Sequence, residues 1–143
     1  MTAKARMIPA MRYRDPNAAV DWLCRAFGFE KHNVFSDANG QIMHAELAYG
    51  GSLMMLGPVA HNDFGKYLKT PDETGEVVTQ LVYVVVDDPD AHYAKAKAAG
   101  AEILRDIQDQ DYGGRDYACR DPQGQIWSFG SYDPWAAASS AGK

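Results

Sequence analysis

The feature that most constrains the fold of this chain is an internal repeat at a constant spacing. The segment Asp15–Ala18 (Asp-Pro-Asn-Ala) recurs 73 positions later as Asp88–Ala91 (Asp-Pro-Asp-Ala). At the same spacing, the apolar run Ser52–Gly57 corresponds to Gln125–Gly130, and each half has an apolar run just before its Asp-Pro pair. Since a solenoid stacks many shorter units, a repeat of this length indicates two copies of one larger unit.

The first half reads as strand, helix and three strands. Asp15 is suited to cap a helix, with Pro16 at the first helical position and Gly28 as its C-terminal stop. Five apolar residues recur at the spacing of one buried helix face: Ala19, Trp22, Leu23, Ala26 and Phe27. The predicted strands are Met7–Tyr13, Glu30–Ser36, Gln41–Tyr49 and Ser52–Gly57.

The second half repeats this order. A helix capped by Asp88 ends at Gly100, and Asp121–Gly124 forms a turn before the last strand. The predicted strands are Thr79–Val86, Glu102–Asp106, Arg115–Arg120 and Gln125–Tyr132. The sequence therefore predicts an α+β fold of two β-α-β-β-β modules, residues 1–60 and 78–133, with a linker at 61–77 and a flexible tail at 134–143.

Composition limits the classes of partner. The 143 residues carry a net charge of −5 with acidic and basic residues interspersed, which argues against a nucleic-acid or anionic-membrane surface. No apolar run is long enough to span a bilayer, and the N-terminus does not read as a signal peptide. We therefore expect a cytoplasmic protein in which Cys24 and Cys119 remain reduced.

Several stretches in this order resemble the vicinal-oxygen-chelate superfamily, which includes glyoxalase I, bleomycin-resistance proteins, fosfomycin-resistance enzymes and extradiol dioxygenases. They are Ala19–Phe29, Val86–Ala91, Ala98–Ala101 and Arg120–Gly130. The match runs from about Ile8 to Trp135, and it is specific to the fold more than to any activity. The resemblance implies that the two modules form a curled eight-stranded mixed sheet around a cavity.

The resemblance also implies where a metal would bind. In the metalloenzymes of this superfamily, four ligands (typically His or Gln, Glu, His, Glu) come from the first and last strand of each unit. The matching positions here are Ile8, Met55, Leu81 and Ser128. None is a competent ligand for a divalent ion. We therefore expect no metal and no cofactor, which favours a branch resembling the bleomycin-resistance proteins over the metalloenzymes.

Candidate ligand-binding residues follow from the alternation of side chains along the strands. Arg12 should share the face of Ile8, where its guanidinium suits an anionic or planar oxygen-bearing ligand, or else pairs with a nearby carboxylate. Inward-facing residues near Leu81 would line a mostly apolar pocket, or else a filled core. The loop before Arg115 could close over a ligand. The expected ligand-binding residues are Arg12, Met55, Tyr83, Tyr112, Arg115 and Ser128.

His44 and Glu46 lie two residues apart on a predicted strand and so share one face. They could chelate a metal together, although such a site needs at least a third ligand, or they could form a polar outer face.

Three functions remain open at this point. The first is a non-catalytic protein, completed by a homodimer, that sequesters a small aromatic or polyoxygenated molecule. The second is an enzyme of the same superfamily. Its metal would bind to His44, Glu46 and a partner chain, or else Tyr83, Arg12 or Asp111 would act in acid–base catalysis. The third is a scaffold whose cavity is filled by side chains.

Overall fold

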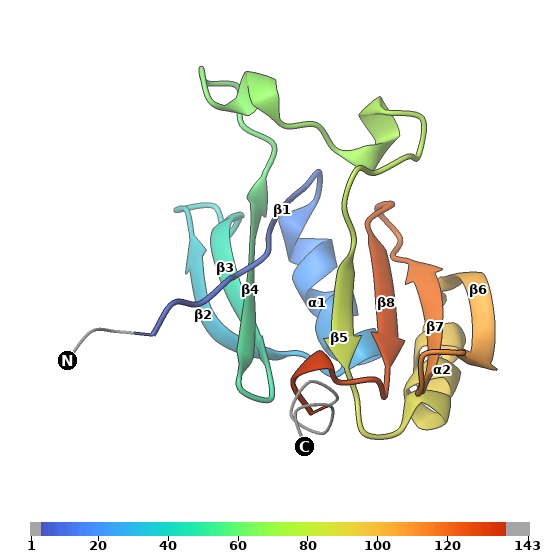
Figure 1. Cartoon of the computed structure of the whole chain (residues 1–143). Helices are drawn as coiled ribbons and strands as arrows, with labels where there is room; N and C mark the ends of the chain where they lie inside the picture. The colour runs from blue at the N-terminus through green and yellow to red at the C-terminus, as the bar shows by residue number, and fades with distance from the viewer. Residues whose placement is uncertain (1–3, 137–143) are drawn as a thin grey trace.

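The computed structural model describes residues 4–136 of the chain and consists of two modules with the same order of elements (Figure 1). The first module comprises β1 (Ala10–Tyr13), α1 (Pro16–Phe27), β2 (Glu30–Ser36), β3 (Ile42–Tyr49) and β4 (Ser52–Pro58). The second comprises β5 (Val82–Val85), α2 (Pro89–Ala98), β6 (Glu102–Asp109), β7 (Arg115–Arg120) and β8 (Ile126–Gly130). The predicted α+β fold of two β-α-β-β-β modules is confirmed.

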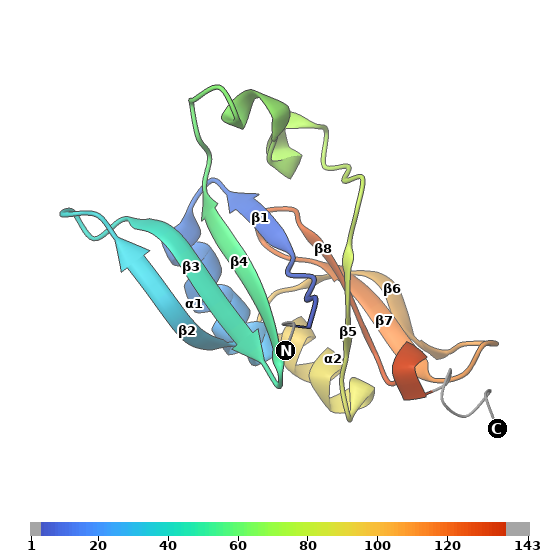
Figure 2. The ribbon, with the colours of Figure 1, turned by 60° about the vertical axis from the view of Figure 1, so that its left-hand side comes forward.

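The strands form two separate four-stranded sheets rather than one curled eight-stranded sheet. The orders are β1-β4-β3-β2 and β5-β8-β7-β6. In each sheet the first pair is parallel, and the other two pairs are antiparallel. The expectation of one continuous sheet is therefore wrong. Its would-be junction strands, β1 and β5, hold only four residues each, and each pairs on one side alone within residues 4–136. Figures 1 and 2 show the two sheets side by side and not closed into a barrel.

The strand register preserves the internal repeat. Ala10 faces Met55 in the first sheet, and Tyr83 faces Ser128 in the second, which is the spacing of 73 positions. On the next strand of each sheet the spacing becomes 72, since Glu46 faces Met55 in the first sheet and Ala118 faces Ser128 in the second. The Asp121–Gln125 turn is one residue longer than the Tyr49–Ser52 turn, and this accounts for the change.

The two modules share one hydrophobic core. Phe27 of α1 packs against Trp127 and Phe129 of β8, with ring centroids 5.4 and 4.6 Å apart. Trp22 donates its indole N–H to the carbonyl of Ala99, 2.8 Å away at the end of α2. Figure 1 shows α1 in the middle of the molecule, between the strands of the two sheets. Helix α1 thus stabilises both modules.

A buried carboxylate also links the modules. Asp121 accepts hydrogen bonds from the Tyr13 hydroxyl at 2.6 Å and the Trp127 indole N–H at 3.1 Å. Its other oxygen accepts the backbone N–H groups of Gln123 and Gln125, both at 3.0 Å. Burial raises the pKa of Asp121, and these hydrogen bonds counteract that rise. Because its acceptors are matched by donors, the carboxylate can hold β1 against the second sheet.

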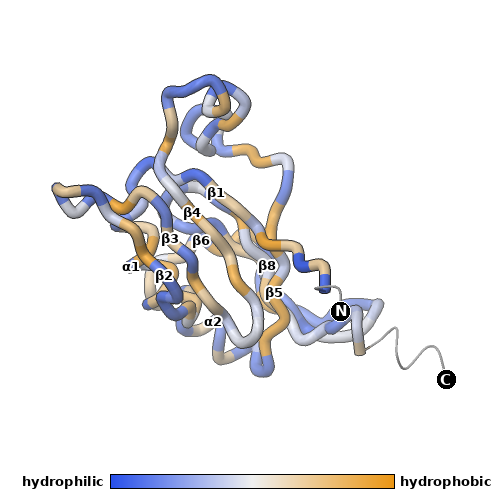
Figure 3. The backbone as a smooth tube through the Cα atoms, turned by 90° about the vertical axis from the view of Figure 1, so that its left-hand side faces the viewer, coloured by the Kyte–Doolittle hydropathy of each residue, from blue (hydrophilic) through white to orange (hydrophobic). Residues whose placement is uncertain are grey.

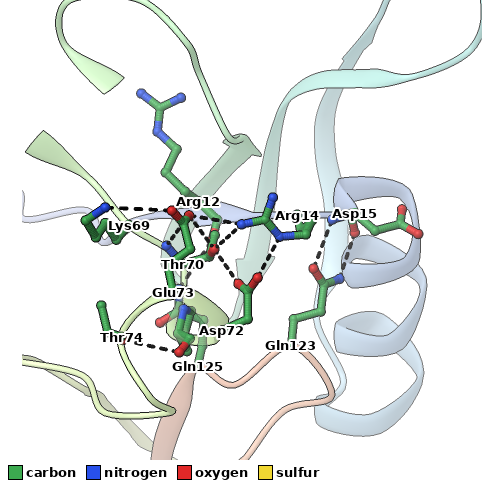
Figure 4. A network of polar contacts seen from close by, with 11 residues as sticks. Arg12, Arg14, Asp15, Lys69, Thr70, Asp72, Glu73, Thr74, Gln123 and Gln125 are labelled. Atoms are coloured by element: carbon green, nitrogen blue, oxygen red, sulfur yellow. Dashed lines mark hydrogen bonds and ion pairs between the residues drawn. The ribbon is translucent and has the colours of Figure 1, made fainter. Parts of the chain in front are cut away.

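The connection between β4 and β5, predicted as a linker at 61–77, contains two short 3₁₀ turns, Gly65–Tyr67 and Pro71–Glu73. Arg14 joins the second turn through ion pairs with Asp72 and Glu73 and a hydrogen bond to Thr70, each 2.9 Å long (Figure 4). The connection is therefore attached to the first module. Of the predicted tail, residues 137–143 lie outside the described residues.

The distribution of apolar residues matches this architecture. Figure 3 shows β5 as a hydrophobic strand, and Val85 at its end and Leu81 just before it are more than a third exposed. No helix within residues 4–136 has the length and apolar character needed to cross a membrane.

Candidate functional site

A cavity of about 500 Å³ lies where the chain approaches the inner edge strands of the two sheets. It is lined by Met7, Ile8, Pro9, Gln80, Leu81, Val82 and Tyr83. Two of the positions at which the resemblance implies metal ligands, Ile8 and Leu81, therefore line the same space although they belong to different modules. Tyr83, which was expected at the cavity, also lines it.

The other two implied ligand positions lie on the strands next to this cavity. Met55 is half-buried, and its backbone N–H donates to the carbonyl of Pro9 at 2.8 Å. Ser128 is only 6 % exposed, and its hydroxyl donates to the carbonyl of Tyr117 at 3.2 Å. Because the flanking Trp127 and Phe129 pack against α1, Ser128 faces the side of the second sheet that is turned away from the helices. We call this side the helix-free face.

One row of four side chains crosses the helix-free face of the second sheet. The register aligns Tyr83 with Ser128, Ser128 with Ala118 and Ala118 with Arg105. The guanidinium Nη2 of Arg105 lies 3.0 Å from a carboxylate oxygen of Asp116 and 3.5 Å from the Ser128 hydroxyl. A basic group thus lies beside an implied metal-ligand position.

Sequence reasoning missed Arg105 as a functional residue. Simple alternation would place Arg105 on the same face as Ile103 and Ile107, both of which pack against the core. Register shifts between Ile103 and Arg105 and between Arg105 and Gln108 break that alternation. The sequence repeat does not reveal this either, because its spacing of 73 aligns Arg105 with His32, whereas the observed register makes it equivalent to Asn33, 72 positions earlier.

Asp116 is the buried partner in an ion pair with Arg105. Its side chain is 3 % exposed, whereas that of Arg105 is 45 % exposed. The carboxylate also accepts hydrogen bonds from the Gln110 amide at 2.8 Å and the Tyr112 hydroxyl at 2.9 Å. Tyr112 therefore lies at this cluster, as a supporting residue. Its contact with Asp116 raises the pKa of the Tyr112 hydroxyl.

Tyr83 is held in one orientation at the other end of the row. Its hydroxyl donates to the carbonyl of Tyr132 at 2.7 Å. Burial, with added repulsion from Asp116, raises the pKa of Tyr83 to about 12. The phenol therefore stays neutral at physiological pH and presents its ring to the cavity as an apolar surface.

The two remaining expected residues lie away from this row. Arg12 donates to the carbonyl of Pro58 at 2.9 Å, and its guanidinium points away from the Arg14 network in Figure 4. Arg12 was alternatively expected to form an ion pair with a carboxylate. Within residues 4–136, no carboxylate lies close enough to Arg12 to form one. Arg115 pairs with Asp90 at the start of α2 and with Asp109, at 3.1 and 3.3 Å. Its side chain therefore lies on the helix side of the sheet, and the structure does not bring it together with the row.

His44 and Glu46 are in contact in the first sheet. The imidazole Nε2 lies 3.0 Å from one carboxylate oxygen of Glu46, and the Asn33 amide donates to the other at 2.9 Å. The hydrogen bonds from Asn33 and His44 lower the pKa of Glu46. Within the described part of the chain, no group of three or more His, Cys, Asp and Glu side chains has the arrangement to hold a metal ion. His44 and Glu46 thus form a hydrogen-bonded pair.

Comparisons with known proteins agree with this architecture. Residues 8–129 match the model of the Glyoxalase/Bleomycin resistance protein/Dioxygenase superfamily. An uncharacterized protein of Mycobacterium bovis is 29 % identical over 122 residues, which cover 85 % of this chain and 80 % of that protein. The crystal structure of TioX from Micromonospora sp. ML1 is similar with a TM-score of 0.70 and 35 % identity, over 88 % of this chain and 94 % of that one.

A more distant likeness shows the fold alone. The fosfomycin resistance protein FosX from Listeria monocytogenes superposes with a TM-score of 0.67 at 13 % identity, over 94 % of this chain and 98 % of that one. The repeated modules, the two mixed sheets and the family match over nearly the whole chain lead to one conclusion. This chain belongs to the Glyoxalase/Bleomycin resistance protein/Dioxygenase superfamily.

Proposed function

We propose that this protein is a non-catalytic, metal-independent binding protein that sequesters a small aromatic or polyoxygenated molecule in the cytoplasm. One observation carries the proposal: residues from both modules meet at a cavity of about 500 Å³, in which the implied ligand positions Ile8 and Leu81 are hydrocarbon. Apolar walls with a few polar groups are typical of small-molecule sites.

The chemistry of the four implied positions does not fit a divalent cation. Ile8 and Leu81 offer no donor atom, and Met55 offers only a soft thioether. The Ser128 hydroxyl lies 3.5 Å from the guanidinium of Arg105, which would repel a metal cation. These residue types support binding by apolar burial and hydrogen bonds in place of metal-centred chemistry.

A homodimer is part of the proposal. Every residue of β2 is exposed, and large apolar side chains on or beside the strands are more than a third exposed: Val34, Phe35, Met43, Leu81, Val85 and Leu104. A second copy would cover such surface and enclose the cavity. Light scattering coupled to size-exclusion chromatography measures this directly, and a monomer at all concentrations would remove the dimer from the proposal.

A ligand titration tests the binding function. Purified protein is titrated with bleomycin, 1,8-dihydroxyanthraquinone and 1-naphthol, by calorimetry and by thermal melting. At ligand concentrations 100-fold above Kd, binding should stabilise the fold by about 2.7 kcal/mol. Leu81→Arg should abolish binding because it places a charge in the cavity, whereas Leu68→Arg, a matched change in the connection, should not. Flat heats and unshifted melting curves throughout would contradict the proposal.

The contact between His44 and Glu46 favours a second candidate, an enzyme of the same superfamily. A dyad held at 3.0 Å is suited to proton transfer, or to metal binding if a partner chain adds a ligand. Metal analysis of protein expressed without a His tag separates the two functions. Near-stoichiometric Zn, Ni, Mn or Fe that is lost in His44→Gln would favour the enzyme and overturn the sequestering function.

A further inference from the structure

The cluster around Arg105 is built in a way that a solvated ion pair is not. Its anion, Asp116, is almost fully buried, while its cation is almost half exposed. Because the negative charge lies beneath the positive one, the surface of the sheet presents the N–H groups of the guanidinium. Burying a carboxylate is costly unless donors surround it, and three side chains here supply those donors.

A glycine on the neighbouring strand leaves room for the cluster. Asp116 faces Gly130 on the neighbouring strand. A Cβ atom at Gly130 would come within 2.6 Å of the Asp116 Cβ and 2.7 Å of the Tyr83 hydroxyl oxygen. Glycine is therefore required where the carboxylate and the phenol approach each other.

The guanidinium has donors to spare. It carries five N–H bonds in one plane. Within residues 4–136, the hydrogen bonds of Arg105 all come from Nη2. The planar group, held from one side by Asp116, can therefore bind two neighbouring oxygens of a ligand in a bidentate manner.

An aromatic surface lies in the same row. Tyr83 and Arg105 stand at the two ends of the row, with Ser128 and Ala118 between them, and Tyr83 also lines the cavity between the modules. A flat ligand in contact with the Tyr83 ring would direct polar substituents along the row toward Arg105. A surface for apolar contact and an oxygen-binding group thus share one face of the sheet.

We infer that Arg105 is the oxygen-binding group of the site and selects planar aromatic ligands that carry a carboxylate. The guanidinium binds the two oxygens, Asp116 positions it, and Tyr83 contacts the ring. This inference rests on the proposed binding function and adds the chemical class of the ligand.

The test compares two probes that differ only in the carboxylate, 1-hydroxy-2-naphthoate and 1-naphthol. The wild-type protein should bind the naphthoate more tightly. Arg105→Gln should weaken naphthoate binding roughly ten- to hundredfold, in line with the loss of charge-assisted hydrogen bonds, and leave 1-naphthol within about twofold. Arg105→Lys should fall between the two, because a lysine keeps the charge without the planar fork.

Two controls keep the result interpretable. Arg25→Gln, a matched change on the exposed surface of α1, should bind both probes as the wild type does. Raising the salt concentration should weaken wild-type binding of the naphthoate and not of 1-naphthol, a readout that requires no variant.

The outcomes separate the two proposals. Equal effects of Arg105→Gln on both probes, or no effect on either, would overturn the role of Arg105 while the binding function stands. Binding of bleomycin or 1,8-dihydroxyanthraquinone without binding of the naphthoate would do the same. A wild-type protein that binds none of these compounds would overturn the binding function, and the inference with it.

Discussion

The two modules have the same backbone plan but different interiors. Among residues 4–136, the buried polar side chains are Thr70, His92, Asp116, Asp121 and Ser128. Thr70 belongs to the connection, and the other four belong to the second module. The buried side chains of the first module are all hydrophobic within this part of the chain, although Tyr13 and Trp22 each donate a hydrogen bond to the second module. The duplicated unit has thus become one half whose interior is almost entirely apolar and another half whose interior holds buried hydrogen-bonded clusters.

The rows that cross the two sheets show the same division. The first row consists of Ala10, Met55, Glu46 and Asn33, and the second of Tyr83, Ser128, Ala118 and Arg105. In the first row, the carboxylate of Glu46 accepts a hydrogen bond from the Asn33 amide. In the second, the guanidinium of Arg105 donates a hydrogen bond to the carboxylate of Asp116. The backbone has kept the register, while the chemistry of equivalent positions has diverged.

The largest expected effect tests whether the two halves unfold together. Phe27→Ala removes a ring that contacts Trp127 and Phe129 of the other module. We expect the free energy of unfolding to fall by about 3–5 kcal/mol, measured by urea denaturation. Phe64→Ala in the connection, where the ring is 62 % exposed, should change it by less than about 0.5 kcal/mol.

Tryptophan fluorescence and circular dichroism should report one transition in the Phe27→Ala variant. Two separate transitions, with only the first module destabilised, would show that the modules are independent and would contradict the shared core.

The next effect compares two turns of the same design. Asp37 and Asp121 each accept two backbone N–H groups of their own turn, but only Asp121 also accepts the Tyr13 hydroxyl and the Trp127 indole. Asp121→Asn places an amide where those donors need an acceptor, so we expect a loss of about 2–3 kcal/mol in unfolding free energy. Asp37→Asn should cost less than about 1 kcal/mol. Equal losses would mean that the contacts between modules add nothing.

A pH titration tests a difference between the two helices, which carry a histidine and an alanine at equivalent positions. His92 of α2 stands 73 positions after Ala19 of α1, and its ring is buried between the Tyr117 hydroxyl and the carbonyl of Phe27. Burial lowers the pKa of His92 below its ordinary value of 6.5. As the pH falls, His92 is therefore protonated in the unfolded chain before it is protonated in the folded protein. The contribution of neutral, buried His92 to the free energy of unfolding is complete above pH 6.5 and is lost as the pH falls below that value, by at most about 1.4 kcal/mol per pH unit.

Melting temperatures of the wild type and of His92→Gln, measured between pH 7.5 and 5, check this expectation. The difference between the two proteins should shrink as the pH falls. A difference that stays constant over this range would show that His92 does not titrate with unfolding.

The smallest expected effect concerns the connection. Arg14 ties the turn Pro71–Glu73 to the first module. Arg14→Gln should leave the melting temperature almost unchanged, because these ion pairs are exposed. It should nevertheless speed trypsin cleavage after Lys66 and Lys69, measured by mass spectrometry. An unchanged cleavage rate would show that Arg14 does not order this segment.

The local rules of sequence explain why the elements were predictable. Each helix begins with an Asp whose side chain caps the N–H of the third residue beyond it, followed by Pro. Strands β2 and β7 begin and end at the predicted residues. The edge strands β1 and β5 are shorter than predicted, because an apolar run does not reveal where pairing with a neighbour begins.

The candidate site was less predictable, because it depends on register and on contacts between distant residues. The repeat placed Ile8 and Leu81 at equivalent positions, and they do line one cavity. The bulges of β6 turned Arg105 to the helix-free face, and the pairing of Arg115 with Asp90 turned that side chain toward α2. Alternation along the strand cannot detect the first event, whereas it does place Arg115 on the same face as the buried Tyr117 and Cys119.

The packing of α1 also has a consequence for synthesis. Phe27 leaves the ribosome about 100 residues before its partners Trp127 and Phe129. Because domains synthesised first generally fold first, the leading copy of such a duplication would be expected to complete its structure alone. Here it must wait for the last strand with an aromatic face uncovered. We therefore expect the growing chain to stay prone to aggregation until β8 emerges and covers this surface.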